Sequence, residues 1–398
     1  MSPGAAMHSR PIARRCSPSS PAAGSSRPRS GYRPRPPRTK AQETRPQNGE
    51  DTMKQGVIGA LLGAALAVSL ASAGALAQTI ELKVSHYLPP NHQMHKQLEA
   101  WGAELAQRSN GRLKLAIFPA AQMGPMPRQY DLARTGVADI AFFLHGALPG
   151  RFPLTEISHL PYAFNRGEGA SAKALSTAEA SGILTEFSGK LAAEHEGTRP
   201  LYFIATPTLS LFFNRPAVKT PAGMRGLRMR HNGPIASAML EAWGATPAAV
   251  PPAELSDSLS KGTIAGMFFN YEAAKSFQMA ESVKSVTELD AAAGTFALVM
   301  NAEKYKLLPE DLRKLIDDTT GPAAARKVGA IYDQAEAEGR AYLRAANAEI
   351  PELSGAERGA FEELAKPVTA SVIARVEAKG IKAKQFYDEL RAAVSAAK

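Results

Sequence analysis

Three histidines near the start of the patterned part of the chain could bind a transition metal. His86 ends an apolar run, and His92 and His95 stand three residues apart where a helix should begin. Imidazole nitrogens are common zinc ligands, and residues three apart share one face of a helix. The chain has no His-Glu-x-x-His pattern and few acidic residues nearby, so the alternative is a solvated helix start without metal. The second interpretation is favoured, and we expect no metal and no cofactor.

The common catalytic and nucleotide-binding motifs are absent from the sequence. It contains no G-x-x-x-x-G-K-[ST] loop, no G-x-G-x-x-G after a strand and no G-x-S-x-G elbow. His145 and His231 follow predicted strands, where a ligand contact and a surface role are both open, and His159 and His195 stand alone in the sequence. No nucleophile is paired with a base at a recognisable spacing, so we predict that the protein is not an enzyme.

The elements that must position these residues begin only after a basic N-terminal stretch. Residues 1–52 hold ten Arg or Lys, three Asp or Glu and nine prolines, and they supply most of the net charge of +10. Such a segment buries too little apolar surface to offset chain entropy, so it should be disordered. A basic arm could bind nucleic acid. The residues that follow favour another explanation, and we expect no nucleic-acid partner.

Residues 53–77 have the pattern of a secretory signal peptide. Lys54 precedes an apolar run over 56–76, and Ala75 and Ala77 occupy the −3 and −1 positions before Gln78. The run approaches the length of a membrane span, so a transmembrane helix is the competing interpretation. The small residues favour cleavage after Ala77 and a periplasmic protein. Translation is then expected to start at Met53, which would make residues 1–52 a misassigned extension.

The sequence from residue 79 onward predicts an α/β fold. Alternating or continuous apolar runs predict strands at 80–84, 113–117, 137–143, 201–205, 227–230, 264–269 and 296–300. Helices are predicted at 94–105, 126–135, 169–194, 235–243 and 254–261, and from Pro309 almost to the end, with breaks near Pro351 and Gly380. The early strand-helix alternation indicates a largely parallel sheet covered by helices. The single cysteine, Cys16, precedes the predicted cleavage site, so the exported chain would have no thiol.

Several segments, in order, resemble the substrate-binding proteins of tripartite ATP-independent periplasmic (TRAP) transporters, the DctP-type family. They are Arg108-Ser-Asn-Gly-Arg-Leu-Lys-Leu, Pro119-Ala-Ala-Gln-Met-Gly, Leu132-Ala-Arg-Thr-Gly-Val-Ala-Asp139, Leu160-Pro-Tyr-Ala-Phe, Asn214-Arg-Pro through Arg230, and Leu308-Pro-Glu-Asp-Leu312. The resemblance implies a two-domain periplasmic binding protein of type II-like fold, with a cleft between the domains and a long helix spanning both. By analogy, the first domain is 79–206 with 295–335, and the second is 207–294 with 336–398. It also implies a monomer that delivers a small carboxylate to a TRAP membrane permease.

The resemblance assigns the ligand carboxylate to Arg230, which ends the segment Gly226-Leu-Arg-Met-Arg. A guanidinium offers two parallel N–H donors that match the two carboxylate oxygens, and it stays protonated. Alternation along a strand places Arg228 and Arg230 on the face opposite Leu227 and Met229. Without the resemblance, Arg230 would be read as an ordinary surface arginine.

Departures from the family pattern bear on the ligand. Where family members often have G-x-[VI]-D-G-x-E-N, this chain reads Gly262-Thr-Ile-Ala-Gly-Met-Phe-Phe-Asn270. Where some members have a second arginine, Thr208 and its neighbours offer only hydroxyls. Phe269, with Tyr87 and Phe143, suggests an apolar pocket for an aromatic or apolar monocarboxylate. The alternative is that Phe268 and Phe269 alternate, so that one of them only packs in the core.

Further cleft residues are expected from strand ends. His86 and Tyr87 end the first strand, His145 follows the third, and Asn270 follows the strand at 264–269. Two other functions remain open at this point. One is a periplasmic sensor module that binds the same ligand, and the other is a periplasmic lyase or hydrolase that uses His86 and His145.

Overall fold

The structure is a computed structural model that describes residues 79–167 and 172–397. The described residues belong to one compact unit. The predicted disordered extension (1–52) and signal peptide (53–77) lie outside the described residues. No helix of the described part is both long and apolar enough to cross a membrane.

The first sheet, sheet I, has the strand order β2-β1-β3-β12-β6. Its strands are β1 (Ile80–His86), β2 (Leu113–Phe118), β3 (Ile140–Leu144), β6 (Thr198–Ala205) and β12 (Thr295–Asn301). β1 pairs in parallel with β2 and β3, but β12 is antiparallel to both β3 and β6. The prediction of a largely parallel sheet is therefore confirmed for β1, β2 and β3, and β12, which enters from a distant part of the chain, is the one antiparallel strand of sheet I.

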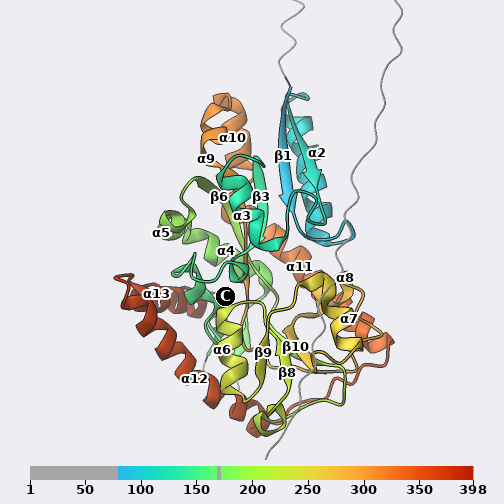
Figure 1. Ribbon diagram of the computed structural model, residues 1–398. Coiled ribbons are helices and arrows are strands. Elements are labelled where there is room, and N and C mark those ends of the chain that lie inside the picture. Colours follow the sequence, from blue (N-terminus) through green and yellow to red (C-terminus); the bar gives the residue numbers. More distant parts are fainter. Residues whose placement is uncertain (1–78, 168–171, 398) are drawn as a thin grey trace, which may run out of the picture. The chain divides into compact units, whose positions relative to one another are not determined.

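The second sheet, sheet II, has the order β11-β7-β10-β8-β9. Its strands are β7 (Ser210–Phe213), β8 (Arg228–Arg230), β9 (Thr246–Ala248), β10 (Gly266–Phe269) and β11 (Ser285–Thr287). β8 lies parallel to β9 and β10, whereas β7 is antiparallel to β10 and β11. Figure 1 shows β8, β9 and β10 grouped with helix α6, and β1 and β3 of sheet I beside α2 and α3. A short pair, β4 (Asn165–Arg166) with β5 (Lys173–Ala174), stands apart from both sheets.

The helices follow from apolar periodicity and from capping residues. In α2 (Gln93–Arg108), Met94, Leu98, Trp101 and Leu105 are buried on one face, as the 4-3-4 spacing predicted. The remaining helices are α3 (Gln129–Arg134), α4 (Thr177–Glu186), α5 (Ser188–Leu191), α6 (Pro234–Ala242), α7 (Leu255–Ser260), α8 (Tyr271–Ser276), α9 (Ala302–Leu307), α10 (Glu310–Asp318), α11 (Gly321–Ala345), α12 (Gly355–Glu377) and α13 (Ala383–Ala396). The breaks predicted near Pro351 and Gly380 separate α11, α12 and α13, which confirms them.

The predicted helix over 169–194 is wrong in extent. α4 begins only at Thr177, where Ser176 and Glu179 form a capping box, and a second short helix, α5, starts after Phe187. The side chain of Ser176 accepts a hydrogen bond from the Glu179 amide, and the Glu179 carboxylate accepts one back from the Ser176 amide. The cap fixes the start of the helix at this point, and the strand β5 precedes it.

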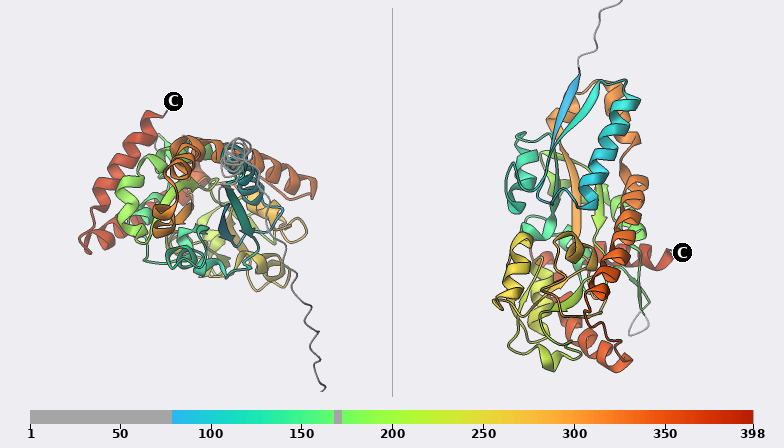
Figure 2. Two further views of the ribbon diagram at one scale, coloured as in Figure 1. Left: turned by 90° about the horizontal axis from the view of Figure 1, so that it is seen from above. Right: turned by 90° about the vertical axis from the view of Figure 1, so that its right-hand side faces the viewer.

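Helix α11 runs beside both sheets, as the orange-red helix in Figure 2 shows. It contacts α2, α4 and β6 near sheet I and α8 near sheet II. Two glycines permit the close approach. A side chain at Gly329 would meet the backbone of α4 at 2.6 Å, and one at Gly339 would meet the Tyr271 carbonyl at 2.2 Å. This is the long helix that spans both domains.

The chain also passes between the sheets through two extended segments that lie together. Residues 206–209 lead from β6 to β7, and residues 288–294 lead from β11 back to β12. The amides of Thr206 and Leu209 donate to the carbonyls of Gly294 and Ala292 at 2.9 and 2.7 Å. The Thr206 hydroxyl in turn accepts from the Gly294 amide at 2.9 Å. The exact domain limits at 206/207, 294/295 and 335/336 stay a prediction.

Candidate functional site

The strand that carries Arg230, β8, is short and lies between β10 and β9 in sheet II. β8 pairs with β10 through Arg230 and Met267, and with β9 through Arg230 and Ala248. Met229 is buried against the core, whereas Arg228 is exposed. Arg230 is the last residue of β8, and the carboxyl ends of parallel strands are where α/β proteins place their ligands.

Arg230 is buried, with an exposed fraction of 2 %. Its Nε donates to the Val250 carbonyl at 3.3 Å, and its guanidinium carbon lies 5.1 Å from the centre of the Phe269 ring. Nη1 is buried and makes no hydrogen bond with any residue that the structure describes. Burial lowers the pKa of Arg230 to about 10, and nearby Tyr87 acts in the opposite direction. The guanidinium is therefore still protonated at neutral pH, with one donor atom available.

A cavity of about 40 Å³ adjoins Arg230 and is lined from both sheets. Its wall is formed by Tyr87, Leu88, His92, Leu144, Thr206, Leu209, Arg230, Asn232, Pro252, Phe269, Asn270, Glu272, Ala273, Phe277 and Phe296. Most of these side chains are apolar or aromatic, and a few polar groups stand among them, as in typical small-molecule sites. Such sites usually enclose roughly 300 Å³ or more, so the walls must separate to admit a ligand.

The structure brings four of the seven predicted site residues to this cavity: Arg230, Tyr87, Phe269 and Asn270. It does not bring the other three there. His86 is buried behind the wall, with Nε2 3.0 Å from Nδ1 of His95. Thr208 donates its hydroxyl to Asp290 at 2.8 Å.

His145, the third of these residues, lies in an aromatic cluster with Phe143, Phe152 and Phe203. Its Nδ1 lies 2.9 Å from the Thr295 carbonyl oxygen, and its Nε2 lies 3.2 Å from Nε2 of His195. Burial lowers the pKa of His145, and the charges of neighbouring histidines act in the same direction. The ring is therefore neutral and lies in the core, at the start of η2, the turn over His145–Ala147.

The expectation of a solvated helix start is wrong, because His86, His92 and His95 are all buried. His92 caps α2: its Nδ1 accepts from the Met94 amide at 3.0 Å. Its Nε2 lies 2.8 Å from Oε1 of Glu272, across the cavity wall from sheet I to sheet II. His159 and His195, which stand alone in the sequence, have buried partners in Thr295 and His145. In 79–167 and 172–397, no three His, Asp or Glu side chains gather as metal ligands.

The two phenylalanines of β10 lie on opposite sides of the strand, as in the alternative interpretation in which only one of them reaches the ligand. Phe269 lines the cavity, whereas Phe268 packs in the core against Trp243, with ring centres 5.4 Å apart. Phe143 also packs in the core, next to Tyr130. Besides Phe269 and Tyr87, two aromatic residues that the sequence did not single out, Phe277 and Phe296, line the cavity.

Sequence reasoning also missed the polar residues Glu272, Asn232 and Thr206 of the cavity wall. Glu272 follows Asn270 by two residues at the start of α8, so the rule that ligand groups follow strand ends could have included it. Asn232 follows Arg230 by two residues and could have been found in the same way. The role of His92 across the wall needs the folded contact to be known.

Next to the cavity, the two sheets meet through backbone atoms at Gly146 and Gly233. A side chain at Gly146 would lie 2.3 Å from the Asn232 carbonyl oxygen, and one at Gly233 would lie 2.9 Å from Cα of Gly146. Only glycine permits this approach between η2 and the start of α6.

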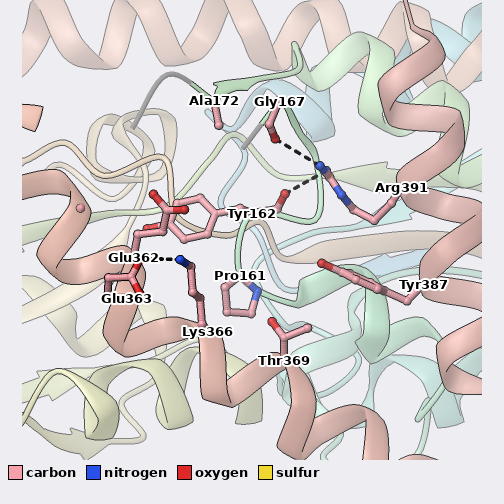
Figure 3. Close-up of a pocket in the computed structure, with 11 residues that line it drawn as sticks. Pro161, Tyr162, Gly167, Ala172, Glu362, Glu363, Lys366, Thr369, Tyr387 and Arg391 are labelled. Carbon is pink, nitrogen blue, oxygen red and sulfur yellow. Dashed lines mark hydrogen bonds and ion pairs between the residues drawn. The ribbon is translucent and has the colours of Figure 1, made fainter. Parts of the chain in front are cut away.

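A larger hollow, of about 650 Å³, lies between the loop after Leu160 and helices α12 and α13. Figure 3 shows Arg391 directed at the Tyr162 and Gly167 carbonyls, and Lys366 beside Glu362 and Glu363. Nη1 of Arg391 donates to the Tyr162 carbonyl at 3.1 Å, and Lys366 pairs with Glu363. Its basic groups thus have partners within the protein, so the cavity at Arg230 is the better candidate for an anion.

The fold consists of two sheets with their helices, joined by two crossing segments, and a cavity lies where the sheets meet. This arrangement is that of a two-domain solute-binding protein. The chain belongs to the bacterial extracellular solute-binding protein family 7, the DctP family, whose model matches residues 84–375. The resemblance to TRAP substrate-binding proteins is thereby confirmed. Proteins of this family bind solutes for transport, so the prediction that the chain is not an enzyme is also confirmed.

Three relatives show the extent of the similarity. The C4-dicarboxylate-binding periplasmic protein DctP of Rhodobacter capsulatus is 27% identical over 334 residues, which are 82% of this chain and 96% of the relative. A marine metagenome TRAP solute-binding protein specific for aromatic acid ligands, solved with 3-hydroxybenzoate, is 26% identical with a TM-score of 0.75, covering 80% of this chain and 98% of that one. A TRAP solute-binding protein from Rhodoferax ferrireducens, solved with copurified benzoate, is 28% identical with a TM-score of 0.73 and the same coverage.

Proposed function

We propose that this protein is the periplasmic receptor of a TRAP transporter for an aromatic monocarboxylate. The observation that carries the proposal is the buried Nη1 of Arg230, which has a free donor position beside the Phe269 ring. A ligand carboxylate would accept from this guanidinium, and an aryl body would pack against Phe269, Phe277 and Phe296 in the cavity wall. The aromatic acids bound by two of the relatives support the same ligand class.

The proposed mechanism is closure of the two sheets over the ligand. Arg230, Phe269 and Asn270 belong to sheet II or to the helix after it, whereas Tyr87 and Phe296 belong to the sheet I side. Only the closed form makes both sets of contacts, so the ligand shifts the population toward it. The closed form would then dock on the membrane permease of the transporter and release the carboxylate there.

A thermal-shift series on the purified protein tests the ligand class. We expect benzoate, 3-hydroxybenzoate and mandelate to raise the unfolding midpoint, because a ligand that binds only the folded state stabilises it by mass action, by about 2.7 kcal/mol at a hundredfold excess over Kd. Succinate and glucuronate, matched for charge sign but lacking an aryl group, serve as controls. Stabilisation by glucuronate or succinate without any by the aromatic acids would refute the proposal.

We further propose export through the signal peptide, with cleavage after Ala77. The support is the small residues at −3 and −1 and the basic residue before the apolar run. Intact-mass measurement of protein recovered from the periplasm should give a chain that starts at Gln78. Ala77→Lys should block processing, whereas Leu76→Ala, at the tolerant −2 position, should not. A mature protein that begins elsewhere, or an unprocessed chain in the membrane, would contradict this site.

A further inference from the structure

The cavity wall holds a second buried charged group besides Arg230, the carboxylate of Glu272. Glu272 is the second residue of α8 and has an exposed fraction of 3 %. Its backbone amide donates to Glu336 at 2.7 Å, which anchors this end of the helix. No hydrogen bond or ion pair joins Glu272 to Arg230 in the part of the chain that the structure describes.

Oε1 of Glu272 is buried and has no aligned hydrogen-bond donor among the described residues. Nε2 of His92 lies 2.8 Å from this oxygen, but the two atoms are not aligned for a hydrogen bond. Because Nδ1 of His92 accepts from the Met94 amide, the ring proton sits on Nε2. His92 thus keeps the carboxylate in place on one side while Oε1 can still accept from another donor.

The cavity wall therefore carries a buried donor without a partner, Nη1 of Arg230, and a buried acceptor, Oε1 of Glu272, whose neighbour Nε2 of His92 makes no aligned hydrogen bond to it. A buried polar group without a partner carries a free-energy cost, and a ligand that supplies the partner removes it. A plain aryl carboxylate satisfies only the arginine. A dicarboxylate satisfies the arginine but brings a second negative charge to Glu272.

We infer that Glu272 selects aromatic monocarboxylates that carry a hydrogen-bond donor, such as a ring hydroxyl, away from the carboxylate. This inference rests on the function proposed above and narrows it. The carboxylate lies at Arg230, the ring lies against Phe269, and the hydroxyl donates to Glu272. The same negative charge excludes ligands with a second carboxylate. Glu272 acts on the ligand directly, and His92 positions it.

Calorimetry with matched ligands tests the inference on the wild-type protein. Each hydroxybenzoate isomer is compared with the fluorobenzoate of the same substitution, which has a similar size but no donor. At least one hydroxybenzoate should bind about tenfold or more tightly than its fluoro partner, as a hydrogen bond to a charged group contributes. Isophthalate should bind more weakly than benzoate. If no isomer exceeds its fluoro partner by threefold, the inference is wrong.

Two variants separate the acceptor from the charge. Glu272→Met removes both, so the preference for the hydroxyl should fall below about threefold while benzoate still binds. Glu272→Gln keeps an acceptor without charge and should improve isophthalate binding. Glu281→Gln, the same chemical change at an exposed position of the sheet II side, should leave all affinities unchanged.

The outcomes distinguish this inference from the proposed function. If the preference for the hydroxyl survives in Glu272→Met, the inferred role of Glu272 is wrong. The proposed function still holds in that case, provided that the wild-type protein binds benzoate. Failure of every aromatic acid to bind the wild type overturns both. Circular dichroism reports whether each variant folds. If Glu272→Met does not fold, the ligand series on the wild-type protein still decides the inference.

Discussion

Replacing Arg230 with alanine should weaken binding of an aromatic carboxylate by about 30-fold or more. The loss of one partner of a buried charge pair costs about 2–5 kcal/mol, and each 1.4 kcal/mol is roughly tenfold in affinity. Arg230→Lys should bind with intermediate affinity, since an ammonium keeps the charge but not the two parallel donors. Isothermal titration calorimetry with benzoate or a hydroxybenzoate measures both effects.

Arg228→Ala is the matched control for this experiment. Arg228 lies two residues earlier on β8 and is exposed, so its loss should change affinity by less than about twofold. The unfolding temperature of the ligand-free Arg230→Ala protein should be measured as well, because the substitution also removes the contacts of Arg230 with the Val250 carbonyl and the Phe269 ring. A loss of affinity below fivefold, in a folded Arg230→Ala protein, would mean that the carboxylate binds elsewhere.

The second large effect is expected from Gly146→Val, which should weaken ligand binding without unfolding the protein. A side chain there meets the Asn232 carbonyl oxygen at 2.3 Å, so the two sheets can no longer approach at the edge of the cavity. Steric overpacking of this kind costs about 1–3 kcal/mol. Apparent affinity falls with the fraction of molecules that reach the closed form, so a loss of roughly 5- to 150-fold follows.

Gly189→Val provides the control, since a side chain at Gly189 meets nothing within 4 Å. It should leave the affinity for benzoate unchanged. Affinity and unfolding temperature should be measured together. If Gly146→Val lowers the unfolding temperature of the ligand-free protein but leaves Kd unchanged, the Gly146–Gly233 contact is a permanent part of the fold and not part of closure.

Much of the fold could be predicted from local patterns. The strands at 80–84, 113–117 and 201–205 and the helices around 94–105 and 235–243 are in the structure because period-2 and period-3.6 patterns were clear there. β7, β9 and β11 were missed, although β8 and β10, which are as short, were predicted. The direction of β12 was also missed, since pairing between segments far apart in the sequence leaves no local signal.

The residues of the cavity, too, could be predicted only in part from the sequence. Arg230 was identified through the family resemblance and Phe269 through a departure from the family pattern, whereas Tyr87 and Asn270 were predictable because each ends or follows a recognisable strand. His145 was placed in the cavity by the same rule, but it lies in the core among Phe143 and Phe152. The contact between His92 and Glu272 joins residues 180 positions apart in the chain, and only the folded structure brings them together. Rules for strand ends found cavity residues on both sheets, Tyr87 and Asn270 among them, but not which side chains touch each other across the cavity wall.

The two crossing segments limit how the protein can move. Residues 206–209 and 288–294 are hydrogen-bonded to each other, so neither can rotate without the other. Helix α11 is held at Gly329 and Gly339 by backbone contacts to both sides, which leaves little room for sliding. If the sheets open as proposed, we expect these contacts to restrict the motion to a swing about one hinge axis. A disulfide engineered across Thr206 and Gly294 would stiffen that axis and slow ligand entry and exit together.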